Sequence, residues 1–270
     1  MTLINGDCLE EMKKLETNTI DLLFCDLPYG QTSCKWDCLI DLDLFWKEVN
    51  RICKDTTPMF FTCSTKFGVS LINSNPKNFR YDLVWVKSAP CGFLNAKKMP
   101  MKKHEMVYVF YKKLPLYDLS SHTHKFLKED ITLKEHKTLY GNLKIQSVTK
   151  REPRYNPPLP DSVIRETTDD EVYKGNITYN HKDRKDPIYE PPLPNSILEI
   201  KSEKGKHATQ KPLGLTEWIL KYYSKSGDKV LDPTMGSGTM GVSCKKMGRE
   251  FIGIELDEKI FKVAENRINN

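Results

Sequence analysis

The chain has 270 residues, of which 39% are hydrophobic and 29% charged, and its net charge is +6. This size and composition predict one large domain, or a domain with an insert, that buries a sizeable core; the modest positive charge permits a polyanionic partner without demanding one. Because no apolar run approaches the ~20 residues that span a bilayer, and no basic-then-apolar leader opens the sequence, we expect an intracellular, cytoplasmic protein.

Residues 1–114 alternate strand-like runs with helical patterns. The runs TIDLLFC, PMFFTC, YDLVWVK and MVYVFY are apolar on consecutive residues, and LDLFWKEVNRIC has the spacing of an amphipathic helix. Consecutive apolar residues are typical of strands buried on both faces, as in a mostly parallel sheet that helices cover. The eight cysteines, none in a CxxC pair, are predicted to be reduced core thiols rather than disulfides or zinc ligands.

The first of these strands ends in the sequence DLPYG, which combines an acid, a rigid turn and an aromatic ring. In an open α/β sheet, ligands lie beyond the carboxyl ends of the strands. There the Asp26 carboxylate and the Leu27 carbonyl can accept hydrogen bonds from the two protons of an exocyclic amino group, and Pro28 can fix both acceptors. Tyr29 offers a face on which a flipped nucleobase stacks.

A basic run and a proline-rich middle zone follow. The run contains Lys97, Lys98, Lys102 and Lys103. Taken alone, it is more typical of a solvated loop than of phosphate contacts. Residues 115–200 are rich in Lys, Asp, Thr, Tyr and Pro and contain the segment PPLP twice, which predicts extended connectors. We interpret this zone as an irregular insert with little core of its own.

The last zone, residues 201–270, contains two successive βα units. In the first, DKVLDPTMGSGTMG places Gly236, Gly238 and Gly241 in a GxGxxG turn between a strand and a helix. In the second, the strand FIGIE ends at Glu255, whose carboxylate can accept hydrogen bonds from ribose hydroxyls. We therefore expect a nucleotide-containing cofactor at this turn.

Asp232, which ends the strand before the glycine turn, discriminates between such cofactors. A carboxylate at the mouth of the site opposes a pyrophosphate but favours a ligand with ammonium and sulfonium groups, namely S-adenosylmethionine. Because the turn lies near the end of the sequence, the rest of the sheet must come from the N-terminal zone. The predicted fold is thus a circularly permuted α/β sheet.

These segments, in this order, resemble the amino-methylating DNA methyltransferases, in particular the permuted beta class and its phage-type members. DLPYG resembles the family's Asp-Pro-Pro-Tyr motif, LDPTMGSGTMG its cofactor loop, and FIGIELDE the strand whose acid holds the ribose. GKHATQKPLGLTEWIL and NGDCLEEMKKL resemble two further cofactor segments. The resemblance covers both outer zones and implies a Rossmann-like, class I methyltransferase fold with helices on both faces of the sheet.

The resemblance also implies roles for individual residues. S-adenosylmethionine would be the methyl donor and S-adenosylhomocysteine the product, with no metal. The catalytic residues would be Asp26, Leu27, Pro28 and Tyr29. The cofactor-binding residues would be Asp7, Thr209, Gln210, Lys211, Pro212, Asp232, Pro233, Gly236, Ser237, Gly238, Thr239 and Glu255. Two positions depart from the family pattern, Leu27 and Ala208, where proline is usual, and neither change removes a catalytic group.

Aspartate, rather than serine, at the start of the catalytic motif implies adenine N6 as the acceptor in double-stranded DNA, in a bacterial or viral setting. The segments 1–114 and 201–270 would form the catalytic domain and 115–200 the target-recognition insert. The lysines expected to face DNA are Lys97, Lys98, Lys102 and Lys103. A homodimer and a cognate restriction endonuclease are further partners that the resemblance allows.

Alternatives stay open at this point. Within the enzyme class, the acceptor can be cytosine N4 or an adenine in RNA. Outside it, the chain can be a catalytically inactive methyltransferase-like protein that only binds DNA. A nicotinamide-dependent oxidoreductase is disfavoured by Asp232 and by the order of the segments.

Overall fold

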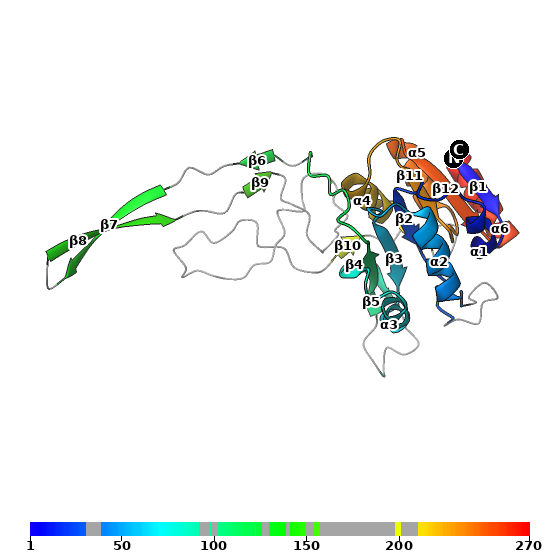
Figure 1. Cartoon of the computed structure of the whole chain (residues 1–270), viewed down its shortest axis with the longest axis horizontal. Helices are drawn as coiled ribbons and strands as arrows, with labels where there is room; N and C mark the ends of the chain where they lie inside the picture. The colour runs from blue at the N-terminus through cyan, green and yellow to red at the C-terminus, as the bar shows by residue number, and fades with distance from the viewer. Residues whose placement is uncertain are drawn as a thin grey trace. The chain divides into compact units, whose positions relative to one another are not determined.

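The computed structural model describes residues 1–30, 39–91, 98, 102–121, 123–125, 130–138, 141–149, 154–156, 198–200 and 210–270. The chain divides into two compact units, one formed by Met1–Tyr117 with Asp161–Asn270 and the other by Asp118–Pro160. Figure 1 labels the helices and strands of both units. The larger unit carries the sheet and the helices on which the site depends.

The larger unit is built on one sheet with the strand order β1-β12-β11-β2-β3-β5-β4-β10. The strands are β1 (Thr2–Asn5), β2 (Leu22–Cys25), β3 (Met59–Cys63), β4 (Phe79–Cys91), β5 (Lys102–Phe110), β10 (Leu198–Ile200), β11 (Lys229–Asp232) and β12 (Glu250–Glu255). All neighbours pair in parallel except β5, which is antiparallel to both β3 and β4. The expected mostly parallel sheet is therefore confirmed.

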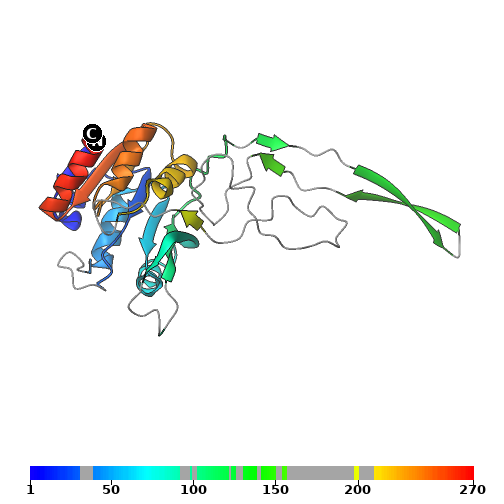
Figure 2. The same ribbon diagram turned by 180° about the vertical axis from the view of Figure 1, so that it is seen from behind.

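The permuted strand order is also confirmed. Strands β11 and β12, late in the sequence, insert between β1 and β2, with Leu231 opposite Leu23 and Gly253 opposite Leu3. Helix α6 (Glu258–Asn269) packs against β1. The two ends of the chain are drawn at the same corner of the sheet in Figures 1 and 2. Neighbouring termini are the arrangement that makes a permuted order possible without breaking the fold.

Helices cover both faces of the sheet. Helices α1 (Cys8–Lys13), α2 (Leu42–Ile52) and α3 (Thr65–Ser74) contact one another in sequence, as do α4 (Leu213–Tyr223), α5 (Thr239–Met247) and α6. Successive residues of β3 show the two sides, because side chains alternate along a strand. Phe60 packs against Tyr223 of α4, and Phe61 packs against Trp46 of α2, at ring distances of 4.9 and 5.4 Å.

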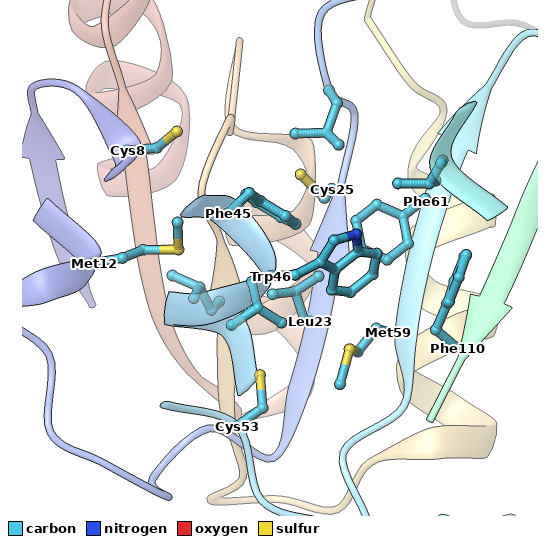
Figure 3. Close-up of a cluster of buried hydrophobic side chains, with 14 of the residues drawn as sticks. Cys8, Met12, Leu23, Cys25, Phe45, Trp46, Cys53, Met59, Phe61 and Phe110 are labelled. Carbon is cyan, nitrogen blue, oxygen red and sulfur yellow. The ribbon is translucent and has the colours of Figure 1, made fainter. Parts of the chain in front are cut away.

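The core under α2 is an aromatic cluster, which Figure 3 shows around Trp46. The Trp46 ring lies 5.6 Å from Phe45, 5.4 Å from Phe61 and 5.2 Å from Phe110. Its indole N–H donates to the Ser74 hydroxyl at 2.8 Å, so the polar atom of this buried ring is satisfied. This cluster fixes α2 and α3 against β3 and β5.

The described cysteine side chains confirm the prediction of reduced core thiols. They are buried and unpaired: Cys8, Cys25, Cys53, Cys63 and Cys244. Burial raises the pKa of Cys8 and of Cys53 to about 12, so these thiols stay protonated and unreactive. Cys34, Cys38 and the side chain of Cys91 lie outside the described residues.

The smaller unit contains regular structure that the sequence analysis did not predict. Strand β6 (Thr123–Lys125) pairs with β9 (Arg154–Asn156), and β7 (Asp130–Thr138) pairs with β8 (Gly141–Thr149), both antiparallel. The sequence of β7, DITLKEHKT, is dominated by polar and charged residues and so lacks a clear strand signal. Both PPLP segments lie outside the described residues. No helix in the described part of the chain is both long and apolar enough to cross a membrane.

Phe61 is the residue by which this packing is best tested. Its side chain is 1% exposed and touches the rings of Phe45, Trp46 and Phe110. We expect Phe61→Ala to lower the free energy of unfolding by about 3–5 kcal/mol, because it deletes a large buried ring and leaves a cavity. Urea denaturation followed by circular dichroism measures this loss.

The matched control is Val69→Ala on α3, where the side chain is 56% exposed. This change should alter the free energy of unfolding by no more than about 0.5 kcal/mol. A loss of less than about 1 kcal/mol for Phe61→Ala would contradict the assignment of this cluster to the core.

Candidate active site

Three carboxylates lie where adjacent parallel strands end. Asp26 follows β2, Asp232 is the last residue of β11, and Glu255 is the last residue of β12. The loops are tied together, since the Thr234 hydroxyl donates to the Asp26 main-chain carbonyl at 3.1 Å. The catalytic motif and the glycine turn predicted from the sequence therefore border one region at the carboxyl edge of the sheet, as the rule for open α/β sheets requires.

The Asp26 carboxylate is held by three donors. Its Oδ1 accepts from the Thr62 hydroxyl at 2.6 Å and from the Tyr29 hydroxyl at 2.8 Å. Its Oδ2 accepts from the Lys211 ammonium at 2.5 Å. An ionised carboxylate offers about four acceptor positions, so the donors in the described residues leave roughly one for another group. The side chain is 27% exposed, which keeps that position open to a ligand.

The rest of the DLPYG motif is fixed by packing. The Leu27 side chain is 3% exposed and belongs to the core cluster, so the leucine that replaces the usual proline anchors the turn from inside. The Tyr29 hydroxyl also lies 2.9 Å from the Thr62 carbonyl, and its ring lies 5.5 Å from Phe67. Burial, and then the charge of Asp26, raise the pKa of Tyr29 well above its usual value, so this phenol remains a neutral donor.

Lys211 joins the DLPYG turn to the glycine turn. Its side chain is 11% exposed, and its ammonium lies 2.5 Å from Asp26 and 3.8 Å from Glu105. Burial lowers the pKa of Lys211, but the charges of Asp26 and Glu105 outweigh burial and raise it, so the ammonium stays charged. Its main-chain carbonyl accepts from the Thr239 hydroxyl at 3.2 Å, at the start of α5.

The glycine turn has the geometry expected of a cofactor loop. Gly236 and Gly238 have φ angles of +52° and +78°, in the left-handed region that favours glycine. A Cβ at Gly238 would stand 2.9 Å from Ile268, so α6 packs closely there. A Cβ at Gly236 would meet nothing within 4 Å, so the backbone faces open space that a ligand can approach. The N-cap position Gly238 makes no side-chain cap hydrogen bond to α5.

Glu255 closes the other side of this turn. Its Oε2 accepts from the Gly236 N–H at 3.0 Å and its Oε1 from the Asp257 N–H at 2.9 Å. Burial raises the pKa of Glu255. The next side chain, Leu256, is 65% exposed and forms an apolar surface beside the carboxylate. Asp7 lies after β1, beside β12, and caps α1 by accepting from the Leu9 N–H at 2.8 Å.

Asp232 is a buried acid whose charge is balanced by few hydrogen bonds or opposite charges among the described residues. Its side chain is 3% exposed, and the Thr234 N–H donates to it at 3.2 Å. Burial raises the pKa of Asp232 well above its usual value; the Thr234 N–H and Lys211 oppose this shift, whereas the charges of Asp26 and Glu255 add to it. A cationic ligand would favour the charged form of this carboxylate, in agreement with the sequence argument for an ammonium and sulfonium compound.

The remaining predicted residues are placed as follows. Pro233, Ser237 and Thr239 are buried in and after the glycine turn, and Gln210 and Pro212 precede α4. Lys98 and Lys102 are exposed. Thr209, Lys97 and the side chain of Lys103 lie outside the described residues.

Four contributors were missed by sequence reasoning. Arg267 of α6 donates to the Ser237 carbonyl at 2.6 Å and to the Ser237 hydroxyl at 2.8 Å, and so fixes the glycine turn against α6. The hydroxyl of Thr62 on β3 donates a hydrogen bond to the Asp26 carboxylate, and the carboxylate of Glu105 on β5 lies beside the Lys211 ammonium. Lys87 on β4 forms an ion pair with Glu105. The one signal for Thr62 and Lys87 is a polar residue next to apolar neighbours in a predicted strand, whereas Glu105 directly precedes the apolar run MVYVFY.

Comparison with known proteins identifies the relatives of this architecture. The family model for N6/N4 enzymes, described as DNA methylase, matches residues 20–266. The type II methyltransferase M.HinfI of Haemophilus influenzae is 25% identical over 296 residues, which cover 99% of this chain and 68% of M.HinfI. The DNA adenine methyltransferase YhdJ of Escherichia coli (strain K12) is 29% identical over 278 residues, covering 99% of this chain and 82% of YhdJ.

A solved structure shows the same fold. The crystal structure of the M1.HpyAVI–SAM complex aligns with a TM-score of 0.58 at 21% sequence identity, covering 100% of this chain and 99% of that protein.

Asp232 provides a test of the site's electrostatics by pH. Because burial raises the pKa of Asp232, the folded state holds this proton more tightly than the unfolded chain, and that stabilisation is lost as pH rises through the raised pKa. We expect Asp232→Asn to be more stable than the wild type at alkaline pH, and the difference to shrink as the pH falls towards the ordinary pKa of an aspartate, as measured by urea denaturation.

The control for this change is Asp55→Asn, at an exposed acid whose pKa is lowered by Lys113. It should bring no gain in stability at the higher pH, because the lowered pKa means that the charged form is the favoured one. A wild type more stable than Asp232→Asn at alkaline pH would contradict the buried, uncompensated carboxylate.

Proposed function

Because the chain belongs to the N6/N4 DNA methylase family, whose model spans residues 20–266, we propose that it transfers a methyl group from S-adenosylmethionine to the N6 amino group of an adenine in double-stranded DNA, at a specific sequence. The observation that carries the proposal is the Asp26 carboxylate, oriented by three donors beside a glycine turn with open space at Gly236. A binding module would need neither feature.

The residues of the turn fit the cofactor. The structure of the M1.HpyAVI–SAM complex, which has this fold, supports the choice. Glu255 would accept from the ribose hydroxyls beside the exposed side chain of Leu256, and Asp232 would favour the cationic part of the cofactor. The uncapped start of α5 would suit the cofactor's carboxylate, because the N–H groups of a helix N-terminus favour an anion. The bound cofactor would supply an electrophilic methyl group on a sulfonium sulfur.

The catalytic turn suits an amino acceptor. An exocyclic amino nitrogen is a poor nucleophile, because its lone pair is delocalised into the ring of the base. Acceptors on both of its protons, the Asp26 carboxylate and the Leu27 carbonyl, would draw the nitrogen towards tetrahedral geometry and stabilise the charge that develops on it. Tyr29 would position the base, and positioning two bound reactants would supply much of the rate.

Adenine is favoured over cytosine for two reasons. The motif begins with aspartate rather than serine, and YhdJ, which aligns over 99% of this chain, is a DNA adenine methyltransferase. The exposed Lys98 and Lys102 would contact phosphates, and the insert 115–200 would read the target sequence.

The first test is methyl transfer by Asp26→Asn. We expect the rate of transfer from labelled S-adenosylmethionine to unmethylated duplex DNA to fall by about 100-fold or more, because an acceptor at the reacting nitrogen is replaced by an amide. Binding of S-adenosylmethionine, measured by calorimetry, should be retained. Nucleoside mass spectrometry of the product identifies the methylated base.

The matched control is Asp55→Asn, which also removes one carboxylate charge but at an exposed position. It should leave the rate unchanged. N6-methyladenine in the DNA treated with the wild type supports the proposal. N4-methylcytosine would show that the acceptor is cytosine and not adenine. Cofactor binding with no methylated base on any DNA contradicts the proposal.

Tyr29→Phe separates the hydroxyl from the ring. The ring beside Phe67 is retained, but Asp26 loses one of its three donors. We expect the rate of methyl transfer to fall about tenfold for Tyr29→Phe, and about 100-fold for Tyr29→Ala, which also removes the surface on which the base stacks. Equal losses in both variants, measured under single-turnover conditions, would contradict a stacking role.

A further inference from the structure

Glu105 is a partly buried carboxylate to which the mechanism above gives no role. It lies on β5, where it stands opposite Trp85 of β4. Its side chain is 17% exposed. Its Oε1 forms an ion pair with the Lys87 ammonium, and its Oε2 makes no hydrogen bond within the described residues but lies 3.8 Å from the Lys211 ammonium. A carboxylate that is largely removed from water lowers the stability of the fold unless an opposite charge or hydrogen bonds balance its own charge.

Together these groups form a row of alternating charge that leads to the catalytic carboxylate. The order is Lys87 on β4, Glu105 on β5, Lys211 before α4 and Asp26 after β2. Their side chains are 18%, 17%, 11% and 27% exposed, respectively. At such burial each interaction is stronger than at a surface, and the loss of one member leaves a neighbour without its countercharge.

We propose that Glu105 is a positioning residue of the methyl-transfer reaction. It holds the Lys211 ammonium against Oδ2 of Asp26, and Lys87 holds Glu105. Asp26 then presents its remaining acceptor position to the target amino group. This role rests on the function proposed above, because it acts through the catalytic carboxylate.

The geometry explains why Lys211 needs such a partner. A lysine side chain loses much rotamer entropy when it is held in one conformation, so a single contact with Asp26 holds it weakly. Burial opposes its charge, whereas the second carboxylate supports it. The charged and titratable groups that face Lys211 are Asp26, Glu105, Asp232 and Cys63. Without Glu105, Lys211 would be drawn towards Asp232, where the cationic end of the cofactor is expected.

The alternative is a purely structural role, in which the ion pair between Glu105 and Lys87 only joins β5 to β4. In that case, loss of Glu105 would lower stability and leave the pH dependence of catalysis unchanged. A positioning role predicts instead a fall in kcat with little change in cofactor affinity, together with an altered pH profile. The two roles therefore differ in what they change.

Glu105→Gln is the variant that separates them, because glutamine keeps the shape and removes the charge. We expect kcat to fall by about 10- to 100-fold, with the Kd for S-adenosylmethionine within about twofold of the wild type. Since the charge of Glu105 raises the pKa of Lys211, its removal lowers that pKa, and the alkaline limb of the pH–kcat profile should move to lower pH. Lys87→Gln should shift the profile in the opposite direction or not at all, because it leaves the Glu105 charge in place.

Glu217→Gln is the matched control. Glu217 lies on the surface of α4 and pairs with the exposed Lys246 at 2.9 Å, so this change removes one carboxylate charge away from the site. It should leave kcat and the pH profile unchanged. An unchanged pH profile in Glu105→Gln, or a loss of cofactor affinity as large as the loss of kcat, would overturn the positioning role.

A second measurement does not depend on activity. In protein labelled with 13C at lysine Cε, the Lys211 resonance is assigned by its disappearance in Lys211→Arg, and its titration is followed by NMR. A lower pKa of Lys211 in Glu105→Gln than in the wild type supports the row of charges even if the wild type methylates no DNA, in which case the proposed function fails alone. An unchanged Lys211 pKa overturns the inference.

Discussion

The ion pair between Lys211 and Asp26 is the interaction on which the site depends. It joins a turn that follows β2 to a segment that precedes α4, two parts of the chain separated by 185 residues. The same segment is tied to the start of α5 through the Lys211 carbonyl and the Thr239 hydroxyl. One lysine thus links the DLPYG turn to the glycine turn. In the proposed reaction, a methyl donor at the glycine turn and an amino acceptor at the DLPYG turn would be held in a fixed relation, which is the condition for an in-line transfer.

This arrangement gathers acids that repel one another. Asp26, Asp232 and Glu105 lie around one buried ammonium, and the raised pKa of Asp232 reflects the cost of burying it. The surrounding structure tolerates the cost because a rigid sheet supports it: Thr62 and Tyr29 fix Asp26, and Arg267 fixes the glycine turn. A cationic methyl donor would add the charge that such a site lacks, so part of the stability given up in the free protein would return on binding.

The sequence predicted the parts of this site that are local. Asp26 and Asp232 each follow a short apolar run, and the glycines at 236 and 238 lie between a predicted strand and a predicted helix. The pattern of apolar residues and the position of the glycines were therefore enough to single these residues out. Arg267 acts through a contact between α6 and a turn 30 residues earlier, which no local pattern encodes. The paired strands of the insert were missed because their alternating apolar residues, Ile131 and Leu133 in β7 and Leu143 and Ile145 in β8, are few among polar and charged neighbours.

Glu105 escaped prediction because of the direction of its strand. The rule for open α/β sheets directs attention to the residues that follow each strand, and it holds for β2, β11 and β12. Strand β5 runs the other way, with Met106 opposite Cys63 at the end of β3. Its first half, not its end, therefore lies at the edge where the site is. Glu105 lies in this polar first half of β5, which begins KKHE, and its side chain is 17% exposed. Its charge is balanced by Lys87 on the neighbouring strand β4 and by Lys211 in the segment before α4. The antiparallel strand thus brings an acid to the site from its beginning, whereas β2, β11 and β12 bring theirs from their ends.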